Sequence, residues 1–290
     1  MKLLSFVHQG QAGYGVLLNG EVADAGACLT LPSPGFAARF PDLGAVLAGQ
    51  ALPALAADVA GRAGSLPLAG LSLLPVLPRP GKIFCVGLNY KSHVAEMKRP
   101  DADRPAIFAR FADSLGAHGA PLAYPGRSER FDFEGELAVV IGRGGRDIAE
   151  ADAWDHIAGY ACFNDGTARD YQRHTHQWTP GKNFPGTGAF GPALVTADEV
   201  GDVNSLTLTT RLNGAVMQQA SLADLIFPLP FIVAYLSQFT PLSPGDVIAT
   251  GTPGGVGDKR EPPLYMQPGD VVEVSITRVG TLHNVVGPRA

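Results

Sequence analysis

Glycine and proline interrupt this sequence so often that few segments of it could form long regular helices. The 290 residues include 36 glycines and 24 prolines, which separate short apolar runs throughout the chain. Proline ends helices and glycine permits tight turns, so this pattern favours many short strands joined by turns over a helical bundle. The glycines and prolines follow no fixed period, which excludes a collagen-like or low-complexity chain.

The overall composition excludes several classes of protein. Hydrophobic residues make up 46% of the chain, enough to bury a sizeable core, and the net charge of −5 includes no clustered basic excess, so we expect no nucleic-acid partner. The N-terminal residues do not resemble a signal peptide, and no apolar run is long enough to cross a membrane. We therefore expect a soluble, cytoplasmic protein with no membrane partner.

The three cysteines are expected to be small buried hydrophobic residues. Cys28, Cys85 and Cys162 lie far apart, each in an apolar neighbourhood, and no two form a Cys-x-x-Cys pair. An odd and scattered set of this kind predicts neither a disulfide framework nor a zinc site.

The chain is predicted to contain a small N-terminal α/β domain over residues 1–72. Strands are expected at 3–7, 14–18 and 21–23. The Ala- and Leu-rich stretch 37–64 has helical spacing and is expected to be split near Pro53. The Pro-rich segment 73–80 is predicted to be a linker, because three prolines in six residues remove the donors that a strand would need.

Residues 81–290 are predicted to form a β-rich α+β catalytic domain. The expected strands are 82–87, 133–141, 157–164, 200–212, 247–250 and 271–276. The expected helices are 89–98 and 221–239, and the charged, Pro-containing segment 99–106 is expected to be a mobile loop. Asn213-Gly214 is a strong hairpin signal.

Three carboxylates at predicted strand ends form the first candidate site. Glu134 and Glu136 enter an apolar strand two residues apart, so their side chains should share a face. Asp165 follows the next apolar strand, in a loop that also carries Arg169 and Lys182. Three carboxylates suit a hard ion, Mg²⁺, Ca²⁺ or Mn²⁺, rather than zinc, and with water as the remaining ligands they would fit Mg²⁺ well. A bare Glu-x-Glu pair is also compatible with a solvated strand end.

Two further features are suggestive but ambiguous by themselves. His93 and Glu96 stand three residues apart on a predicted helix, where a carboxylate could orient an imidazole as a general base, although a plain surface pair has the same spacing. The Gly-rich segment 251–257, which contains Thr252, lacks both the Walker and the dinucleotide-binding patterns. Its backbone could approach an anionic ligand closely, or it could be a structural turn. His174 and His176 lie in the same predicted loop as Asp165 but are not assigned to the site, because an isolated loop histidine more often faces solvent.

Together these segments resemble the fumarylacetoacetate hydrolase family over roughly residues 80–287. The motifs that carry the resemblance are Gly87-Leu88-Asn89-Tyr90 with His93 and Glu96, Asp132-Phe133-Glu134-Gly135-Glu136-Leu137, Asn164-Asp165 with Arg169 and Gln172, Gly181-Lys182, and Thr250-Gly251-Thr252-Pro253-Gly254-Gly255-Val256-Gly257. The resemblance implies a mixed β-sandwich roll for the catalytic domain and a homodimer. Residues 1–72 match the accessory domain of longer members more loosely.

The resemblance also implies the role of each site residue. Glu134, Glu136 and Asp165 would hold one Mg²⁺ or Mn²⁺. His93 and Glu96 would form a dyad on a lid, and Lys182 would face the oxygens bound to the metal. Arg169, Gln172 and Thr252 would bind the carboxylate and keto groups of a small keto-acid substrate. Asp132 would contact the site residues rather than the substrate, or would only begin the strand.

The implied reaction is hydrolysis of a C–C bond in a 2,4-diketo acid, an acylpyruvate such as fumarylpyruvate or maleylpyruvate, to pyruvate and a carboxylic acid. The same family chemistry allows an oxaloacetate-type decarboxylase or a 2-hydroxymuconate-type isomerase or decarboxylase. A hypothesis from another class is a non-catalytic ion- or sugar-binding β module, and a glycosidase that uses Glu134 and Glu136 as its acid pair is disfavoured by their position on one strand.

Overall fold

A large mixed sheet forms the centre of the protein in the computed structural model, which describes residues 1–98 and 103–289. Its strands, in order across the sheet, are β2 (Gln11–Leu17), β1 (Lys2–His8), β14 (Gly188–Thr196), β12 (Ile157–Asn164), β11 (Gly135–Ile141), β17 (Val247–Ala249), β6 (Ile83–Gly87) and β7 (Ala106–Arg110). Two short strands join it: β5 (Ser72–Leu73) pairs with β1, and β8 (Leu115–Gly116) pairs with β14.

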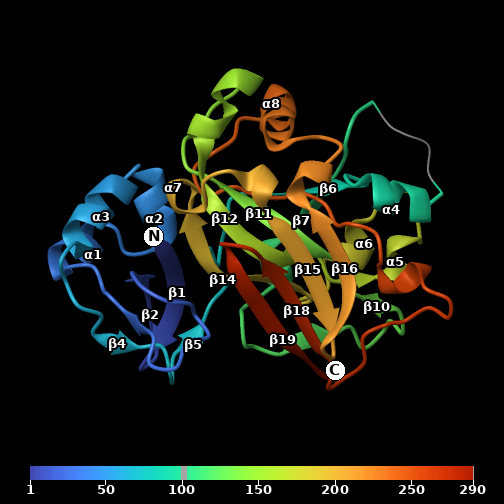
Figure 1. Cartoon of the computed structure of the whole chain (residues 1–290), viewed down its shortest axis with the longest axis horizontal. Helices are drawn as coiled ribbons and strands as arrows, with labels where there is room; N and C mark the ends of the chain where they lie inside the picture. The colour runs from blue at the N-terminus through green and yellow to red at the C-terminus, as the bar shows by residue number, and fades with distance from the viewer. Residues whose placement is uncertain (99–102, 290) are drawn as a thin grey trace.

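A second sheet of five strands packs against one face of the first (Figure 1). Its strands are, in order, β16 (Ala215–Ser221), β15 (Thr207–Leu212), β18 (Val271–Ile276), β19 (Gly280–Arg289) and β9 (Leu122–Tyr124). Two small pairs complete the strands: β10 (Phe131–Asp132) with β13 (Thr167–Ala168), and β3 (Cys28–Leu29) with β4 (Leu66–Pro67). The predicted β-rich fold with a packed pair of sheets is therefore confirmed.

Strand β11 is buried on both faces, which explains its continuous apolar sequence. Leu137, Val139 and Ile141 belong to the core between the two sheets. Ala138 and Val140 point the other way, into a core that includes apolar residues of the N-terminal helices. Strand side chains alternate between faces, so a strand between two cores needs apolar residues at every position.

The helices are short, and apolar residues of the N-terminal ones share a core with one face of the large sheet. They are α1 (Pro34–Arg39), α2 (Leu43–Ala48), α3 (Leu52–Val59), α4 (Lys91–Glu96), α5 (Arg169–Gln172), α6 (Thr179–Lys182), α7 (Ala197–Val200) and α8 (Leu229–Phe239). Figure 1 shows α1–α3 together at the N-terminal side and α4–α6 together at the opposite side of the molecule. In the part of the chain that the structure describes, no helix has the length and apolar character needed to span a membrane.

Two details of the N-terminal prediction are wrong. Residues 21–23 form a turn rather than a strand, because the Asp24 carboxylate accepts a hydrogen bond from the Glu21 N–H at 2.6 Å and folds the chain back. The helical stretch 37–64 belongs to three helices, because Asp42 caps the start of α2 by accepting from the Ala45 N–H at 2.7 Å. Pro53 lies in the first turn of α3, where its missing N–H is tolerated.

Two predicted elements of the C-terminal part are shorter than expected. The helix expected at 221–239 is confined to α8, since Pro228 and Pro230 allow it to begin only near residue 229. The strand expected at 200–212 is confined to β15, preceded by turns. Of the expected mobile loop 99–106, residues 99–102 lie outside the described residues and Ala106 begins β7.

The N-terminal residues do not stand apart from the main sheet. Strand β1 pairs with β14 through Lys2 opposite Val195 and Leu3 opposite Leu194. Val76, within the Pro-rich segment 73–80, is fully buried. The division of the chain at residues 72 and 80 remains a prediction, and the two parts share one continuous sheet.

Candidate active site

The three carboxylates meet where β11 and β12 pair. Glu134 comes immediately before β11, Glu136 is its second residue, and Asp165 comes immediately after β12. The Asp165 N–H donates to the Glu134 carbonyl oxygen at 2.8 Å, which holds the two strand ends together. One oxygen from each of the three carboxylates lies within 4.8 Å of the others, and all three residues are buried. Three carboxylates grouped in this way could hold one metal ion.

Gly135, between the two glutamates, is needed because the second sheet packs closely against this position. A Cβ atom on it would lie 2.0 Å from Thr210 Oγ1 of the second sheet. Thr210 and Val274 fill the space next to Gly135. The absence of a side chain at residue 135 therefore allows the start of β11 to approach β15 closely.

Three buried cationic side chains surround the carboxylates. The ammonium of Lys182 contacts Glu134 Oε2 at 2.6 Å and Asp165 Oδ2 at 2.5 Å. Arg169 Nη2 lies 2.6 Å from Glu134 Oε1, and Arg110 Nη1 lies 2.6 Å from Asp165 Oδ1. Burying a charge without a partner is energetically costly, so these ion pairs allow the carboxylates to be buried.

The surroundings shift the pKa values of the two glutamates in opposite directions. Burial raises the pKa of Glu134, but the charges of Arg169 and Lys182 outweigh it and hold this pKa well below its ordinary value. Burial raises the pKa of Glu136 well above its ordinary value, and the neighbouring charges of Asp165 and Glu134 raise it further. A divalent cation among the three oxygens would offset this repulsion, so the residues present fit a metal ion.

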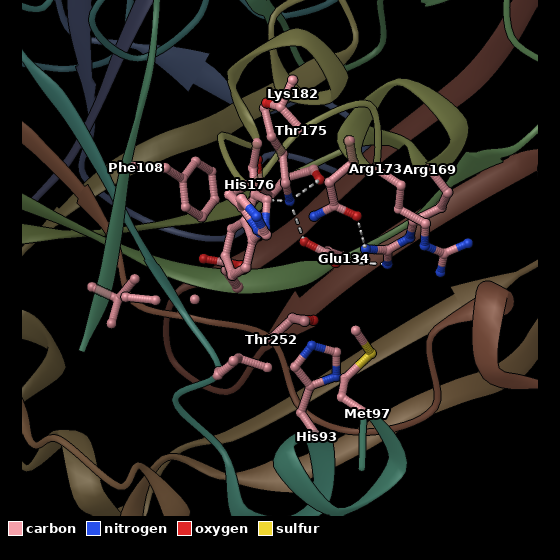
Figure 2. A pocket seen from close by; sticks show the side chains of 18 residues that line it. His93, Met97, Phe108, Glu134, Arg169, Arg173, Thr175, His176, Lys182 and Thr252 are labelled. Carbon is pink, nitrogen blue, oxygen red and sulfur yellow. Dashed lines mark hydrogen bonds and ion pairs between the residues drawn. The ribbon is translucent and has the colours of Figure 1, made fainter. Parts of the chain in front are cut away.

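His93 and Glu96 lie on α4, and His93 faces Glu134 across the cavity (Figure 2). His93 Nδ1 is 2.7 Å from Glu96 Oε1, so the carboxylate orients the ring and leaves Nε2 free of hydrogen bonds to the described residues. Glu96 Oε2 in turn accepts the Gly255 N–H at 2.8 Å. The expected dyad geometry is therefore present, and the Gly-rich segment 251–257 supports it.

A cavity of about 450 Å³ lies between the dyad and the carboxylates. Its lining includes all three carboxylates, His93, Lys182 and the expected substrate contacts Arg169, Gln172 and Thr252 (Figure 2). Val86, Met97, Phe108 and Trp178 add an apolar part to the wall. One end of the cavity is therefore ionic and suited to a carboxylate and a keto oxygen, while the rest can accept carbon.

All three expected substrate contacts already have partners within the protein. Arg169 Nε donates to Asp132 Oδ2 at 2.8 Å and Nη1 donates to Gln172 Oε1 at 3.1 Å. Its Nη2 is buried and, apart from its ion pair with Glu134, makes no hydrogen bond among the described residues. Thr252 Oγ1 donates to the Gly135 carbonyl oxygen at 2.9 Å and accepts from Gln218 Nε2 at 2.7 Å. Thr252 thus fixes the segment 251–257 to β11, whereas Arg169 keeps a donor for a ligand.

The sequence interpretation missed two supporting residues. Arg110 is fully buried and ends the otherwise apolar strand β7, and a lone charge in such a run is a signal that could have indicated it. Gln218 donates to Thr252 and accepts the Gly135 N–H at 3.0 Å, but it lies in an ordinary polar stretch that gave no signal. Asp132 contacts Arg169 rather than the cavity, and its carboxylate also accepts the N–H groups of Gly257 and Asp258.

Comparison with known proteins agrees with this geometry. The family model described as fumarylacetoacetate (FAA) hydrolase C-terminal matches residues 82–287. The protein "oxaloacetate tautomerase fahd2, mitochondrial" of Xenopus laevis is 41% identical over 218 residues, which cover 74% of this chain and 68% of that protein.

Two solved structures share the fold. The fumarylacetoacetate hydrolase of Exiguobacterium antarcticum is 32% identical with a TM-score of 0.83, and the match covers both chains completely. The fumarylpyruvate hydrolase of Pseudomonas aeruginosa, solved with Mn²⁺ and pyruvate, is 32% identical with a TM-score of 0.66 over 75% of this chain and 92% of that one. The chain belongs to the fumarylacetoacetate hydrolase family.

Proposed function

We propose that this protein is a metal-dependent enzyme that acts on oxaloacetate or a closely similar 2-oxo acid and moves a proton at the carbon next to the keto group. The single observation that carries the proposal is the buried carboxylate triad opposite the His93–Glu96 pair in one cavity. The relatives named as oxaloacetate tautomerases support this substrate over the acylpyruvates expected from the sequence alone.

The ionic end of the cavity would bind the carboxylate and 2-oxo group of the substrate. Glu134, Glu136 and Asp165 would hold Mg²⁺ or Mn²⁺, which would act as a Lewis acid on the 2-oxo group and make the neighbouring C–H more acidic. Arg169 offers its buried Nη2 to the substrate carboxylate. Lys182, which is kept charged by Glu134 and Asp165, adds positive charge where the enolate oxygen develops.

His93 is the base in this scheme. Glu96 holds Nδ1, so Nε2 can take the proton from C3 and return it to the oxygen, which converts the keto form to the enol; the reverse sequence converts the enol to the keto form. No atom is gained or lost in this tautomerisation. In a decarboxylase, the C3–C4 bond of the bound oxaloacetate would break and C4 would leave as CO₂. The enolate of pyruvate that remains would then be protonated at C3.

A second candidate is the C–C hydrolysis of an acylpyruvate. It is favoured by the apolar part of the cavity wall, at Phe108 and Trp178, which exceeds what a four-carbon diacid needs, and by the likeness to a fumarylpyruvate hydrolase. In that reaction His93 would take a proton from water, which would add to the 4-carbonyl before the C3–C4 bond breaks. The relatives favour the oxaloacetate reaction over this one.

A panel of substrates separates these reactions. Protein loaded with Mg²⁺ or Mn²⁺ would be given enol-oxaloacetate, keto-oxaloacetate, fumarylpyruvate and maleylpyruvate, while enol absorbance and pyruvate release are followed. Accelerated interconversion of the oxaloacetate tautomers without pyruvate supports the proposal. Pyruvate from oxaloacetate indicates a decarboxylase, pyruvate from the acylpyruvates indicates a hydrolase, and both outcomes would overturn tautomerisation as the main reaction. The predicted homodimer and cytoplasmic location are separate proposals that size-exclusion chromatography and cell fractionation can test.

A further inference from the structure

Arg173 differs in its surroundings from the other strongly basic side chains of the active-site cavity. Among the described residues that line the cavity, Arg169 and Lys182 are buried and pair with the carboxylate triad. Arg173 also lines the cavity (Figure 2), but its side chain is 44% exposed and pairs with Asp258 instead. Arg173 therefore supplies positive charge to a part of the cavity away from the proposed metal ligands.

A second cavity, of about 350 Å³, borders the first at Arg173. Its lining consists of Arg130, Arg173, Asp258, Lys259, Pro263 and Tyr265. Arg173 belongs to both linings, so it stands at the boundary between the two spaces. The second lining holds three cations and one carboxylate, so an anion that approaches from this side meets a net positive charge.

Asp258 holds the Arg173 guanidinium in place without occupying all of its donors. Arg173 Nη2 donates to Asp258 Oδ2, while the other oxygen of this carboxylate accepts from the Tyr265 hydroxyl at 2.9 Å. Lys259 Nζ lies 3.5 Å from the same carboxylate, so Asp258 has a second cation beside it. Among the described residues, Nε and Nη1 of Arg173 have no hydrogen-bond partner. These donors are available to a carboxylate of a ligand.

The proposed substrate has a second charged group that needs a partner in this cavity. Oxaloacetate carries carboxylates at C1 and C4, and the ionic end would bind only the C1 carboxylate and the 2-oxo group. Much of the remaining wall is apolar, as at Phe108 and Trp178, and a carboxylate placed against it would lose water without gaining a donor. A cationic group on the wall would remove this cost.

The spacing of Arg169 and Arg173 suits the two ends of a short diacid. Arg169 begins α5 and Arg173 is its C-cap residue, four positions later. Residues four apart on a helical turn are neighbours, with about 5–6 Å between their Cβ atoms. The two carboxyl carbons of oxaloacetate are separated by three C–C bonds of about 1.5 Å each. One carboxylate can therefore lie near Arg169 while the other lies near Arg173.

We propose that Arg173 is a specificity-determining residue that binds the distal carboxylate of the substrate, so that the enzyme prefers dicarboxylic 2-oxo acids to those with an uncharged distal end. This inference rests on the proposed function and deepens it, because it names the class of 2-oxo acid. Arg173 acts on the choice of substrate, and the proton transfer at C3 remains with His93 and the metal centre.

The test compares two substrates that differ only in their distal charge. Metal-loaded full-length protein would be given the enol forms of oxaloacetate and of its 4-methyl ester, which keeps the C1 carboxylate and the 2-oxo group. The informative quantity is the kcat/KM for oxaloacetate divided by the kcat/KM for the ester, because general damage to the protein lowers both by the same factor. In Arg173→Gln this ratio should fall by about 10-fold or more, since a charge-assisted contact is lost.

Arg130→Gln is the matched control. Arg130 is an exposed arginine of the second cavity that does not line the first, so its loss removes the same charge without removing the proposed contact. The ratio should stay near the wild-type value in this variant. Arg173→Lys keeps the charge but not the planar fork, so it should retain part of the preference. An unchanged ratio in Arg173→Gln, or an equal fall in Arg130→Gln, would overturn the inference.

Inhibition by pyruvate guards against an indirect effect of Arg173 on the ionic end. Pyruvate has the carboxylate and the 2-oxo group but no distal carboxylate, so its inhibition constant should stay within about twofold of wild type in Arg173→Gln. A rise as large as the fall in the ratio would show that Arg173 only supports Arg169, and the inference would be wrong.

Failure of the proposed function gives a different result. If wild-type protein accelerates the tautomerisation of neither compound above the uncatalysed rate, the proposed function is wrong. Calorimetric titration of wild type and Arg173→Gln with oxaloacetate and its ester then makes the same comparison through the ratio of the two Kd values. A ratio that is the same in both proteins would overturn the inference about Arg173 as well.

Discussion

Glu96 Oε1 lies 2.7 Å from His93 Nδ1, while its other carboxylate oxygen accepts the Gly255 N–H at 2.8 Å. The carboxylate that orients the His93 ring is therefore itself held by a segment about 160 residues further along the chain. A second hydrogen bond connects α4 to this segment, since the Ser92 hydroxyl accepts the Gly254 N–H at 3.1 Å. The position of α4 and the direction of the imidazole depend on the same Gly-rich segment.

Replacing His93 should separate catalysis from metal binding. His93→Ala removes the proposed base but none of the three carboxylates, so kcat should fall by about 10²–10⁴ while the Kd for Mn²⁺ stays within a few-fold of wild type. Steady-state kinetics and calorimetry measure the two quantities. A variant with wild-type kcat on its best substrate would exclude His93 as the base.

Replacing Lys182 should move metal binding and turnover in opposite directions. Its ammonium contacts two of the three proposed metal ligands, so Lys182→Met removes a cation that would oppose the metal and should tighten Mn²⁺ binding. Turnover should fall by about 10² or more, because charge on the enolate oxygen loses its partner. Weaker Mn²⁺ binding in this variant would show that Lys182 instead supports the geometry of the carboxylates.

Metal binding should release a proton. Burial and the charges of Asp165 and Glu134 raise the pKa of Glu136 well above its ordinary value, and a divalent cation binds only the deprotonated carboxylate. Affinity should therefore rise with pH. Calorimetric titrations in two buffers with different ionisation enthalpies should give heats that differ by the release of about one proton. Equal heats would mean that Glu136 is already ionised before the metal binds.

His118 should make the fold weaken in mild acid. Burial, and then the neighbouring His283, lower the pKa of His118 from 6.5 to about 4, so the folded protein favours its neutral form. This contribution to stability is complete above about pH 6.5 and is lost as the pH falls toward about 4, by at most about 3 kcal/mol.

Urea unfolding at about pH 7 and about pH 5 checks the role of His118. His118→Gln, which can still accept the His283 N–H, should reduce the loss of unfolding free energy between the two pH values. The exposed His8 supplies the control His8→Gln, which should behave as wild type. Identical pH dependence in His118→Gln and wild type would assign the acid sensitivity to other groups.

The sequence predicted the parts of the site that depend on local pattern. Glu134, Glu136 and Asp165 stand at the ends of apolar strands, and antiparallel pairing of those strands brings them together. His93 and Glu96 are neighbours on one helical turn, so their contact also follows from spacing.

The parts that depend on distant segments could not be predicted in this way. Arg110 reaches Asp165 across 55 residues, and Gln218 reaches Thr252 from a strand of the second sheet. Residue spacing also does not indicate that the Thr252 hydroxyl donates to the Gly135 carbonyl oxygen. The apolar pattern does not reveal the break between α1 and α2, because caps such as Asp42 act through side-chain contacts.

The central claim is that His93 and a metal held by Glu134, Glu136 and Asp165 together move a proton at C3 of oxaloacetate. The direct measurement is the stopped-flow decay of enol-oxaloacetate absorbance with wild-type protein, with and without Mg²⁺ or Mn²⁺, and with His93→Ala in the presence of metal. Fast decay is predicted only for wild-type protein with metal, without release of pyruvate. Equal decay after complete chelation, or in metal-loaded His93→Ala, would contradict the account.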